Sequence, residues 1–506
     1  MKSKKKEIAD ICLIVEGSYP YVTGGVASWV QRLIKTFEHE FTFSVVALTA
    51  GDKTDEDMKY QLPSNVISFK SFNIFDYEFI RNARPVKLKK KKKQKINAVI
   101  KELMLKGFRT GRLTQDQKTL LVDILNTYKE GLLKDFLISH DGFKVLTEIY
   151  EERHREDGFL KYFYNWRNIH FVIWRIFMLL TELPKARIYH SPSTGFAGFL
   201  VCLMTELYNI PSIITEHGIY VQEREMELTS VSWLDEYYLI QMWLDFFKSL
   251  IYWEYQTVSS LITLYYGNKA LQIEYGAPEE KIKVIPNGIN MERFVPCRKE
   301  RLTSWPPKIG IVARIDPVKD IKTFIEAVSI IKEKIPDIQA YIIGPAEDKE
   351  YHNDCLKLVN MLGLQKNITF TGSVDVTKYY KELDLVLLTS VKEAMPLAIM
   401  EAMASGIPVV ATKVGACEEL VFGLNDGLGQ AGFVATVMDA EDIAANSLKI
   451  LTNKEFANSL AQVGIKRIES FYYEDILQQS YRKEYISLME LNKVVKKNTN
   501  KDGNAI

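Results

Sequence analysis

The chain has 506 residues, 47% of them hydrophobic and 25% charged, which is the composition of a globular protein long enough for two domains. Its 65 lysines and arginines almost balance 64 aspartates and glutamates, so the net charge of +1 gives no electrostatic reason to expect nucleic-acid binding. The five cysteines are odd in number and lack CxxC spacing, which argues against a disulfide framework and against a zinc site.

The N-terminal segment is not expected to be a signal peptide. Residues 1–7 are basic, but the apolar strand that follows is too short for the core of a signal peptide. The most apolar window, residues 171–180, is interrupted by Arg175 and is far shorter than a membrane span. We therefore expect a cytoplasmic protein.

The first half of the chain reads as an α/β domain. Short apolar runs bounded by turn residues predict buried parallel strands at 11–15, 43–48, 188–190, 212–215 and 261–264. Between about 76 and 182, apolar residues recur at helical spacing and predict a helical insertion. The Lys89–Lys93 run at its entrance is interpreted as a solvated loop, with contact to an anionic membrane surface as the alternative.

Two loops of this first half could carry chemistry. The Gly24-Gly25 pair follows the first predicted strand and opens a helix, so its backbone amides could approach a phosphate, although Gly-Gly also makes ordinary turns. His217 follows the strand at 212–215 and could present donors to a substrate, although a single histidine is more often structural. The candidates for an acceptor side are Glu16, Tyr220 and Arg224.

The second half repeats the α/β pattern. Its strands are predicted at 308–313, 340–343, 368–370, 385–388 and 409–411, after a proline-rich linker at 286–307. Arg314 and Lys319 follow the first of these strands, just ahead of an amphipathic helix. Two cations at the carboxyl end of a strand suit a diphosphate, whereas alone they would be ordinary surface residues.

Two carboxylates flank the start of another helix. Glu393 follows the strand at 385–388, Pro396 suits the first helical turn, and Glu401 lies further along the helix. Because the residues around Glu401 are apolar or small, the helix is predicted to be buried, and a carboxylate there needs a partner. The alternative is a solvent-exposed acidic pair. No dinucleotide fingerprint or phosphate-binding P-loop is present.

Four segments resemble the retaining GT-B glycosyltransferases of family four in order and rough spacing: Gly24-Gly25, Pro286-Asn287-Gly288-Ile289, Arg314-x4-Lys319 and Glu393-x7-Glu401. Within that family the chain resembles the PelF-like group of Pel exopolysaccharide synthesis. The segments that carry this finer resemblance are 16–20, 216–220, 319–324 and 344–348. Asn290 and Asp320 depart from the residues that the family often has there, Asp and Gly.

The resemblance implies an α/β GT-B fold with two Rossmann-like domains facing across a cleft. The N-terminal, acceptor-side domain would span residues 1–290 and contain the helical insertion at about 76–182. The C-terminal nucleotide-sugar domain would span 291–470, a helix at 471–491 would cross back to the first domain, and 492–506 would be a disordered tail.

The resemblance also implies roles for the candidate residues. Arg314 and Lys319 would neutralise the diphosphate, Glu401 would bind the ribose, and Glu393 would face the transferred sugar. Gly25 would offer a backbone amide to the phosphate, and His217 would lie beside the sugar. The remaining residues expected to bind the nucleotide sugar are Met395 and Leu397. Glu393, His217, Arg314 and Lys319 are the residues expected to act in catalysis.

The expected function is therefore the transfer of a hexose or hexosamine from a nucleotide sugar to a growing Pel-like polysaccharide of a biofilm, with retention of configuration. The resemblance implies that the nucleotide is UDP. We expect no cofactor and no metal, since the two cations can stabilise the departing diphosphate. The expected partners are the UDP-sugar, the polysaccharide acceptor and an inner-membrane exopolysaccharide synthase complex, with no nucleic acid. Such a complex would place this cytoplasmic protein at the cytoplasmic face of the membrane. Two rivals stay open, namely a GT-B nucleotide-sugar epimerase and a non-catalytic scaffold of a membrane synthase.

Overall fold

The computed structural model describes two compact units of the chain. The first comprises the residues up to Thr263, Lys269–Lys283 and the residues from Arg482 on, and the second comprises Leu264–Asn268 and Val284–Tyr481. The domain boundaries expected at 290, 470 and 491 stay a prediction. The described residues are 8–76, 78, 91, 94–96, 98–99, 102, 112–128, 140–153, 156–231 and 234–501.

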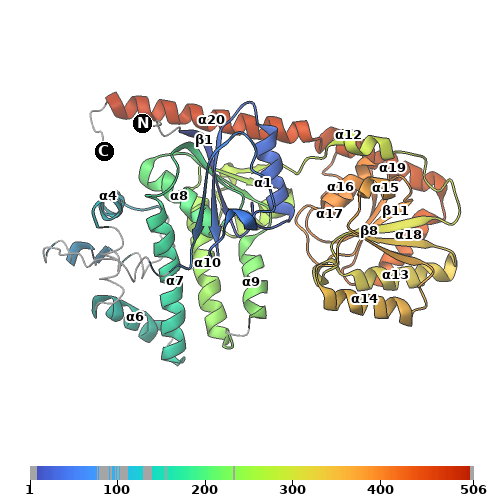
Figure 1. Ribbon diagram of the computed structural model, residues 1–506, viewed down its shortest axis with the longest axis horizontal. Helices are drawn as coiled ribbons and strands as arrows, with labels where there is room; N and C mark the ends of the chain where they lie inside the picture. The colour runs from blue at the N-terminus through green and yellow to red at the C-terminus, as the bar shows by residue number, and fades with distance from the viewer. Residues whose placement is uncertain are drawn as a thin grey trace. The chain divides into compact units, whose positions relative to one another are not determined.

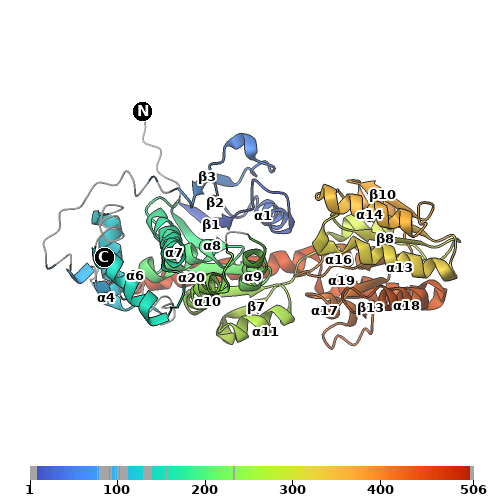
Figure 2. The same ribbon diagram turned by 90° about the horizontal axis from the view of Figure 1, so that it is seen from below.

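The first unit is built on a sheet that has seven strands among the described residues, in the order β3-β2-β1-β4-β5-β6-β7. Figure 2 labels β3, β2, β1 and β7 of this sheet. The strands are β1 Ala9–Glu16, β2 Phe43–Thr49, β3 Val66–Asn73, β4 Ala186–Ser191, β5 Ser212–Glu216, β6 Ser260–Thr263 and β7 Ile282–Val284. In this order, all neighbouring strands from β3 to β6 run parallel to each other. The five predicted runs all fall on strands. The sequence missed β3, which is half-exposed and carries Lys70 and two serines, and β7, which is only three residues long.

Helices cover both faces of this sheet. They are α1 Gly25–Thr36, α8 Phe196–Tyr208, α9 Tyr220–Ser230, α10 Tyr237–Thr257 and α11 Tyr266–Glu274. Where the sequence predicts the insertion, the described residues between β3 and β4 form α4 Gln115–Asp123, the π-helical turn Ile124–Tyr128, α6 His140–Arg153 and α7 Phe159–Leu179. The helices α7, α8 and α10 lie beside one another (Figure 1), and their buried side chains belong to one core. Apart from Lys91, the Lys89–Lys93 run lies outside the described residues.

The last helix, α20, spans Glu474–Lys501, and its second part packs within the first unit. His190, fully buried at the end of β4, lies 2.9 Å from the hydroxyl of Thr215 on β5 and 2.8 Å from the hydroxyl of Tyr485 on α20. Arg482 pairs with Glu40 at 2.7 Å. The helix continues to Lys501, and residues 502–506 lie outside the described part. The disordered tail expected from 492 stays a prediction.

We expect His190 to make the stability of the first unit pH-dependent. Burial, together with nearby His217, lowers the pKa of His190 to about 3, against about 6.5 in an unfolded chain. Between these values the unfolded chain binds more protons, so stability is complete above pH 6.5 and falls as the pH drops. Relative to His190→Gln, the wild-type protein should lose about 2 kcal/mol of unfolding free energy between pH 6.5 and 5. Urea unfolding across that range measures this loss, and parallel pH profiles for the two proteins would contradict it.

The second unit has a sheet of six strands among its described residues, in the order β10-β9-β8-β11-β12-β13. Figure 2 labels β10 and β13 at its two edges and β8 between them. The strands are β8 Lys308–Val312, β9 Gln339–Ile343, β10 Ile368–Gly372, β11 Leu385–Leu388, β12 Val409–Thr412 and β13 Gly432–Ala435, and all neighbours are parallel. The sequence predicted every strand except β13, an edge strand of four residues. This order is a doubly wound sheet, which places ligands beyond the carboxyl ends of its strands.

Helices of the second unit form two layers, with α13 and α14 on one face of the sheet and α16 on the other (Figure 1). The helices are α12 Met291–Phe294, α13 Ile321–Lys334, α14 Lys349–Met361, α15 Val376–Tyr380, α16 Leu397–Ala404, α17 Cys417–Phe422, α18 Ala440–Leu451 and α19 Lys454–Phe471. Short 3₁₀ turns occur at Asp55–Asp57, Glu279–Lys281, Val295–Cys297 and Pro317–Lys319. Within the described ranges of both units, every helix is too short or too polar to cross a membrane.

Candidate functional site

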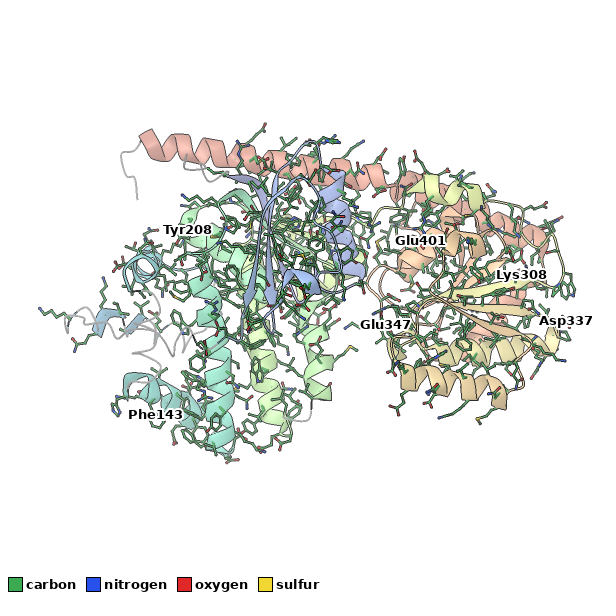
Figure 3. All side chains as sticks on the ribbon, in the orientation of Figure 1. Phe143, Tyr208, Lys308, Asp337, Glu347 and Glu401 are labelled. Atoms are coloured by element: carbon green, nitrogen blue, oxygen red, sulfur yellow. The ribbon has the colours of Figure 1, made fainter. Side chains whose placement is uncertain are left out.

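The candidate residues of the second half gather at the carboxyl edge of the second sheet. Arg314 comes just after β8, Glu393 follows β11, and Glu401 lies about one turn into α16. Figure 3 shows Glu347 and Glu401 at the end of this unit opposite Lys308 and Asp337, which stand at the amino ends of β8 and β9. This is the edge at which an open α/β sheet binds its ligand.

Lys319 and Glu393 form an ion pair at this edge. The ammonium nitrogen of Lys319 lies 2.7 Å from Oε1 of Glu393, and the two side chains are 18% and 15% exposed. The next residue, Asp320, has a left-handed backbone with φ 46°, and its carboxylate caps α13 by accepting from the backbone N–H of Thr323 at 3.4 Å and also accepts from the Thr323 hydroxyl at 2.6 Å. The departure from glycine at position 320 is therefore explained, because aspartate tolerates this conformation and adds a helix cap.

Arg314 is exposed and is held by two carboxylates. One guanidinium nitrogen pairs with Glu347, and another lies 3.6 Å from Asp316. The loop with Glu347 comes close because Gly344 has no side chain, and a Cβ there would lie 2.0 Å from the carbonyl oxygen of Ala313. The guanidinium thus has two carboxylate partners in this structure, and diphosphate oxygens are acceptors of the same kind.

The loop before α16 is fixed by its neighbours. Pro396 is the residue that precedes the first helical turn, and the helix begins at Leu397, one position later than the sequence suggested. Gly415, which has a positive φ, packs on the loop so closely that a Cβ would lie 2.2 Å from the carbonyl oxygen of Ala394. Met395 is buried, and its sulfur accepts from the backbone N–H of Asn287 at 3.3 Å. These contacts therefore hold the backbone of the loop that carries Glu393 in place.

Two hydroxyl groups that the sequence reasoning missed contact the two carboxylates. Ser390 donates to Oε1 of Glu393 at 2.8 Å, and Tyr380 donates to Oε2 of Glu401 at 3.2 Å. Burial, reinforced by the carboxylate of Glu401, raises the pKa of Tyr380 well above its usual value, so its hydroxyl keeps its proton. Ser390 could have been found because it lies three residues before Glu393 at a strand end. Tyr380, on α15, leaves no such signal in the sequence.

In the first unit, the structure brings Glu16, Tyr220 and Arg224 together. Oε2 of Glu16 accepts from the backbone N–H groups of Phe196 and Ala197 at the start of α8, at 2.9 and 3.3 Å. Its Oε1 accepts from the hydroxyl of Tyr220 at 2.9 Å, and the guanidinium of Arg224 lies 4.8 Å from the Tyr220 ring centroid. Burial raises the pKa of Glu16, although Arg224 and these donors oppose the rise.

His217 lies at the carboxyl edge of the first sheet, and Gly25 is the first residue of α1. The His217 ring packs edge-on against Trp29 with centroids 4.8 Å apart, and its Nε2 is buried without a hydrogen-bond partner among the described residues. Burial, with help from the charge of Arg32, lowers the pKa of His217 to about 4, so the imidazole is neutral at pH 7. A Cβ on Gly25 would meet no atom within 4 Å, so this glycine is not required by packing.

The predicted site residues thus form two groups, one in each unit. Arg314, Lys319, Glu393 and Glu401 share an edge of the second unit, with Met395 and Leu397 beside them, while the first unit holds Gly25, His217, Glu16, Tyr220 and Arg224. In the described ranges, no three His, Cys, Asp or Glu side chains gather as metal ligands. The roles of all these residues and the metal-independent reaction stay predictions.

Two family models match the chain. Residues 9–280 match the family described as "Domain of unknown function (DUF3492)", and residues 298–467 match "Glycosyl transferases group 1". A galactosyltransferase of Escherichia coli, the UDP-Gal:alpha-D-GlcNAc-diphosphoundecaprenol alpha-1,3-galactosyltransferase, is 27% identical over 54% of this chain and 67% of its own length. Seven further curated relatives are matched over 38 to 63% of their lengths.

Solved structures agree on the fold. The chain is similar to Anabaena Alr3699/HepE in complex with UDP, with a TM-score of 0.57, 15% identity, and coverage of 94% of this chain and 99% of that one. Sucrose-phosphate synthase from Thermosynechococcus elongatus gives a TM-score of 0.58 at 15% identity over 95% of this chain and all of its own. The predicted GT-B fold and the predicted enzyme class are confirmed. The chain belongs to the DUF3492 family and is a glycosyltransferase of GT-B fold with a group 1 glycosyl transferase domain in its second unit.

Proposed function

We propose that this glycosyltransferase moves a hexose or hexosamine from a UDP-sugar to a growing polysaccharide, with retention of configuration and without a metal ion. The observation that carries the proposal is the arrangement at the carboxyl edge of the second sheet. There Lys319 pairs with Glu393, and Arg314 and Glu401 come from elements of the same edge; each of the two carboxylates, Glu393 and Glu401, accepts from a buried hydroxyl.

The charges that develop during the reaction indicate how these residues would act. Breaking the sugar–phosphate bond builds negative charge on the departing diphosphate and positive charge on the anomeric carbon. Arg314 and Lys319, which pair with carboxylates in this structure, would turn to the diphosphate and stabilise its growing negative charge. Glu401 would bind the ribose hydroxyls, and Glu393 would bind the sugar.

The names of similar proteins support the choice of donor and acceptor. The Escherichia coli relative is named for transfer from UDP-Gal to a sugar carried on a lipid diphosphate, and the HepE structure holds UDP. The likeness of residues 16–20, 216–220, 319–324 and 344–348 to the PelF-like group favours an exopolysaccharide of Pel type as the acceptor. A synthase complex at the inner membrane is the partner that this assignment entails.

The proposal is tested by incubating the protein with UDP-glucose, UDP-galactose, UDP-N-acetylglucosamine and UDP-N-acetylgalactosamine in the presence of EDTA. Release of UDP that an added glycan acceptor accelerates, with a product whose anomeric configuration by NMR matches the donor, supports transfer with retention. Interconversion of the sugar without an acceptor would identify an epimerase instead. Failure to bind any UDP compound would favour the scaffold.

We expect Arg314→Ala and Glu401→Ala each to weaken UDP binding by about ten- to a hundredfold, because each removes a charge-assisted hydrogen bond. Calorimetry with UDP measures the affinities. Lys357→Ala and Glu382→Ala are controls of each charge, since these exposed residues of the same unit pair with Asp354 and Lys308 on its surface. Unchanged UDP affinity in both site variants would refute the assigned roles.

A further inference from the structure

One carboxylate oxygen in the donor site has two partners of different kinds. Oε1 of Glu393 lies 2.7 Å from the ammonium nitrogen of Lys319 and 2.8 Å from the hydroxyl oxygen of Ser390. Ser390 is 1% exposed, so its hydroxyl is shielded from water and aimed at this oxygen. A hydrogen bond to a charged acceptor in such a place is stronger than one in water.

The two partners differ in what substrate binding would do to them. The proposed function assigns Lys319 to the diphosphate, and a long ammonium side chain that turns toward phosphate shares or leaves its contact with Glu393. The Ser390 side chain is short, and the proposed function gives it no contact with the diphosphate. Its hydrogen bond to Oε1 of Glu393 can therefore persist throughout the reaction.

The backbone of Ser390 is locked from both sides. Its carbonyl oxygen accepts from the hydroxyl of Thr412 on β12 at 2.6 Å. The hydroxyl of the preceding residue, Thr389, shares its proton between the carbonyl oxygens of Lys319 and Asp320, each at 2.9 Å. The N–H of Val391 donates to the carbonyl oxygen of Val318, also at 2.9 Å. These bonds fix the Ser390 hydroxyl relative to both the Lys319 turn and the Glu393 loop.

We propose that Ser390 is a positioning residue that keeps the Glu393 carboxylate aimed at the donor sugar while Lys319 takes up the charge of the diphosphate. The inference rests on the proposed function and concerns only the sugar end of the donor. Ser390 should consequently affect how the intact UDP-sugar is bound and turned over, and should leave the binding of UDP, which has no sugar, unaffected.

The test compares wild-type protein with Ser390→Ala in two measurements. UDP affinity by calorimetry should change less than about twofold, which also shows that the variant is folded. Turnover of the best of the four UDP-sugars named above should fall about ten- to a hundredfold in kcat/KM, the cost of one hydrogen bond to a charged group. The matched control is Ser447→Ala, which removes another fully buried serine hydroxyl, one that bonds to the carbonyl of Ile443 on α18.

A double-mutant cycle shows whether Ser390 acts through Glu393. In a Glu393→Ala background, Ser390→Ala should cause no further loss, because the group that it positions is gone. Full additivity of the two losses, an unchanged kcat/KM in the single variant, or an equal loss of UDP affinity and turnover would each overturn the proposal. If wild-type protein binds no UDP, the proposed function itself fails, which is a separate and recognisable result.

Discussion

Lys319→Ala is expected to lower kcat/KM for sugar transfer by about a hundred- to a thousandfold, the loss seen when one preorganised group that stabilises transition-state charge is removed. Two effects combine here. The diphosphate loses a cation at the moment when its negative charge grows, and Glu393, whose side chain is only 15% exposed, loses the ammonium that balances its charge. Steady-state turnover of the UDP-sugar, with UDP affinity measured in parallel, gives the loss.

Lys322→Ala is the matched control for this variant. Lys322 lies on α13 only three positions later, and it pairs with Asp354 at 3.3 Å on a surface where both side chains are about two-fifths exposed. Such an exposed pair contributes little, so the control should keep wild-type turnover within about twofold. Comparable losses in the two variants would mean that general charge near α13, and not the Lys319–Glu393 pair, supports activity.

The strands and loops that carry the donor site could be predicted from the sequence, because their residue patterns depend only on neighbouring positions in the chain. Apolar runs such as 385–388 and 409–411 form buried parallel strands, and the residues directly after such strands must reach the same sheet edge. That reasoning placed Arg314, Lys319 and Glu393 together without any tertiary information. It also anticipated that Glu401, on an apolar helix, needs a partner.

The identities of those partners could not be predicted, because they depend on packing between separate elements. Tyr380 reaches Glu401 from α15, which precedes β11, and no spacing rule links the two residues. Glu347 reaches Arg314 only because Gly344 lets two backbones approach closely. The strand β3 was missed for a different reason, since a half-exposed strand with Lys70 and two serines lacks the apolar pattern that identifies buried strands.

Arg467→Ala is expected to destabilise the second unit by about 3 to 5 kcal/mol, the usual cost of removing one partner from a buried ion pair. Arg467, on α19, is fully buried and pairs with Asp426 through two contacts, at 2.7 and 3.1 Å. It also donates to the carbonyl oxygens of Leu420 and Val421, at 3.1 and 2.7 Å, which end α17. The variant would leave a buried carboxylate and several carbonyls without donors, and thermal unfolding should shift down by about 10 °C.

Lys466→Ala is the control, because Lys466 is the exposed neighbour of Arg467 and the variant removes a positive charge from the surface. It should change the unfolding temperature by less than about 2 °C. The double variant Asp426→Ala with Arg467→Ala separates charge from packing. If an uncompensated carboxylate causes most of the loss, removing Asp426 as well should restore part of the stability lost in Arg467→Ala. Further loss in the double variant would instead show that the contacts of Asp426 with its own loop, such as the N–H of Leu428 at 3.0 Å, stabilise the unit independently of Arg467.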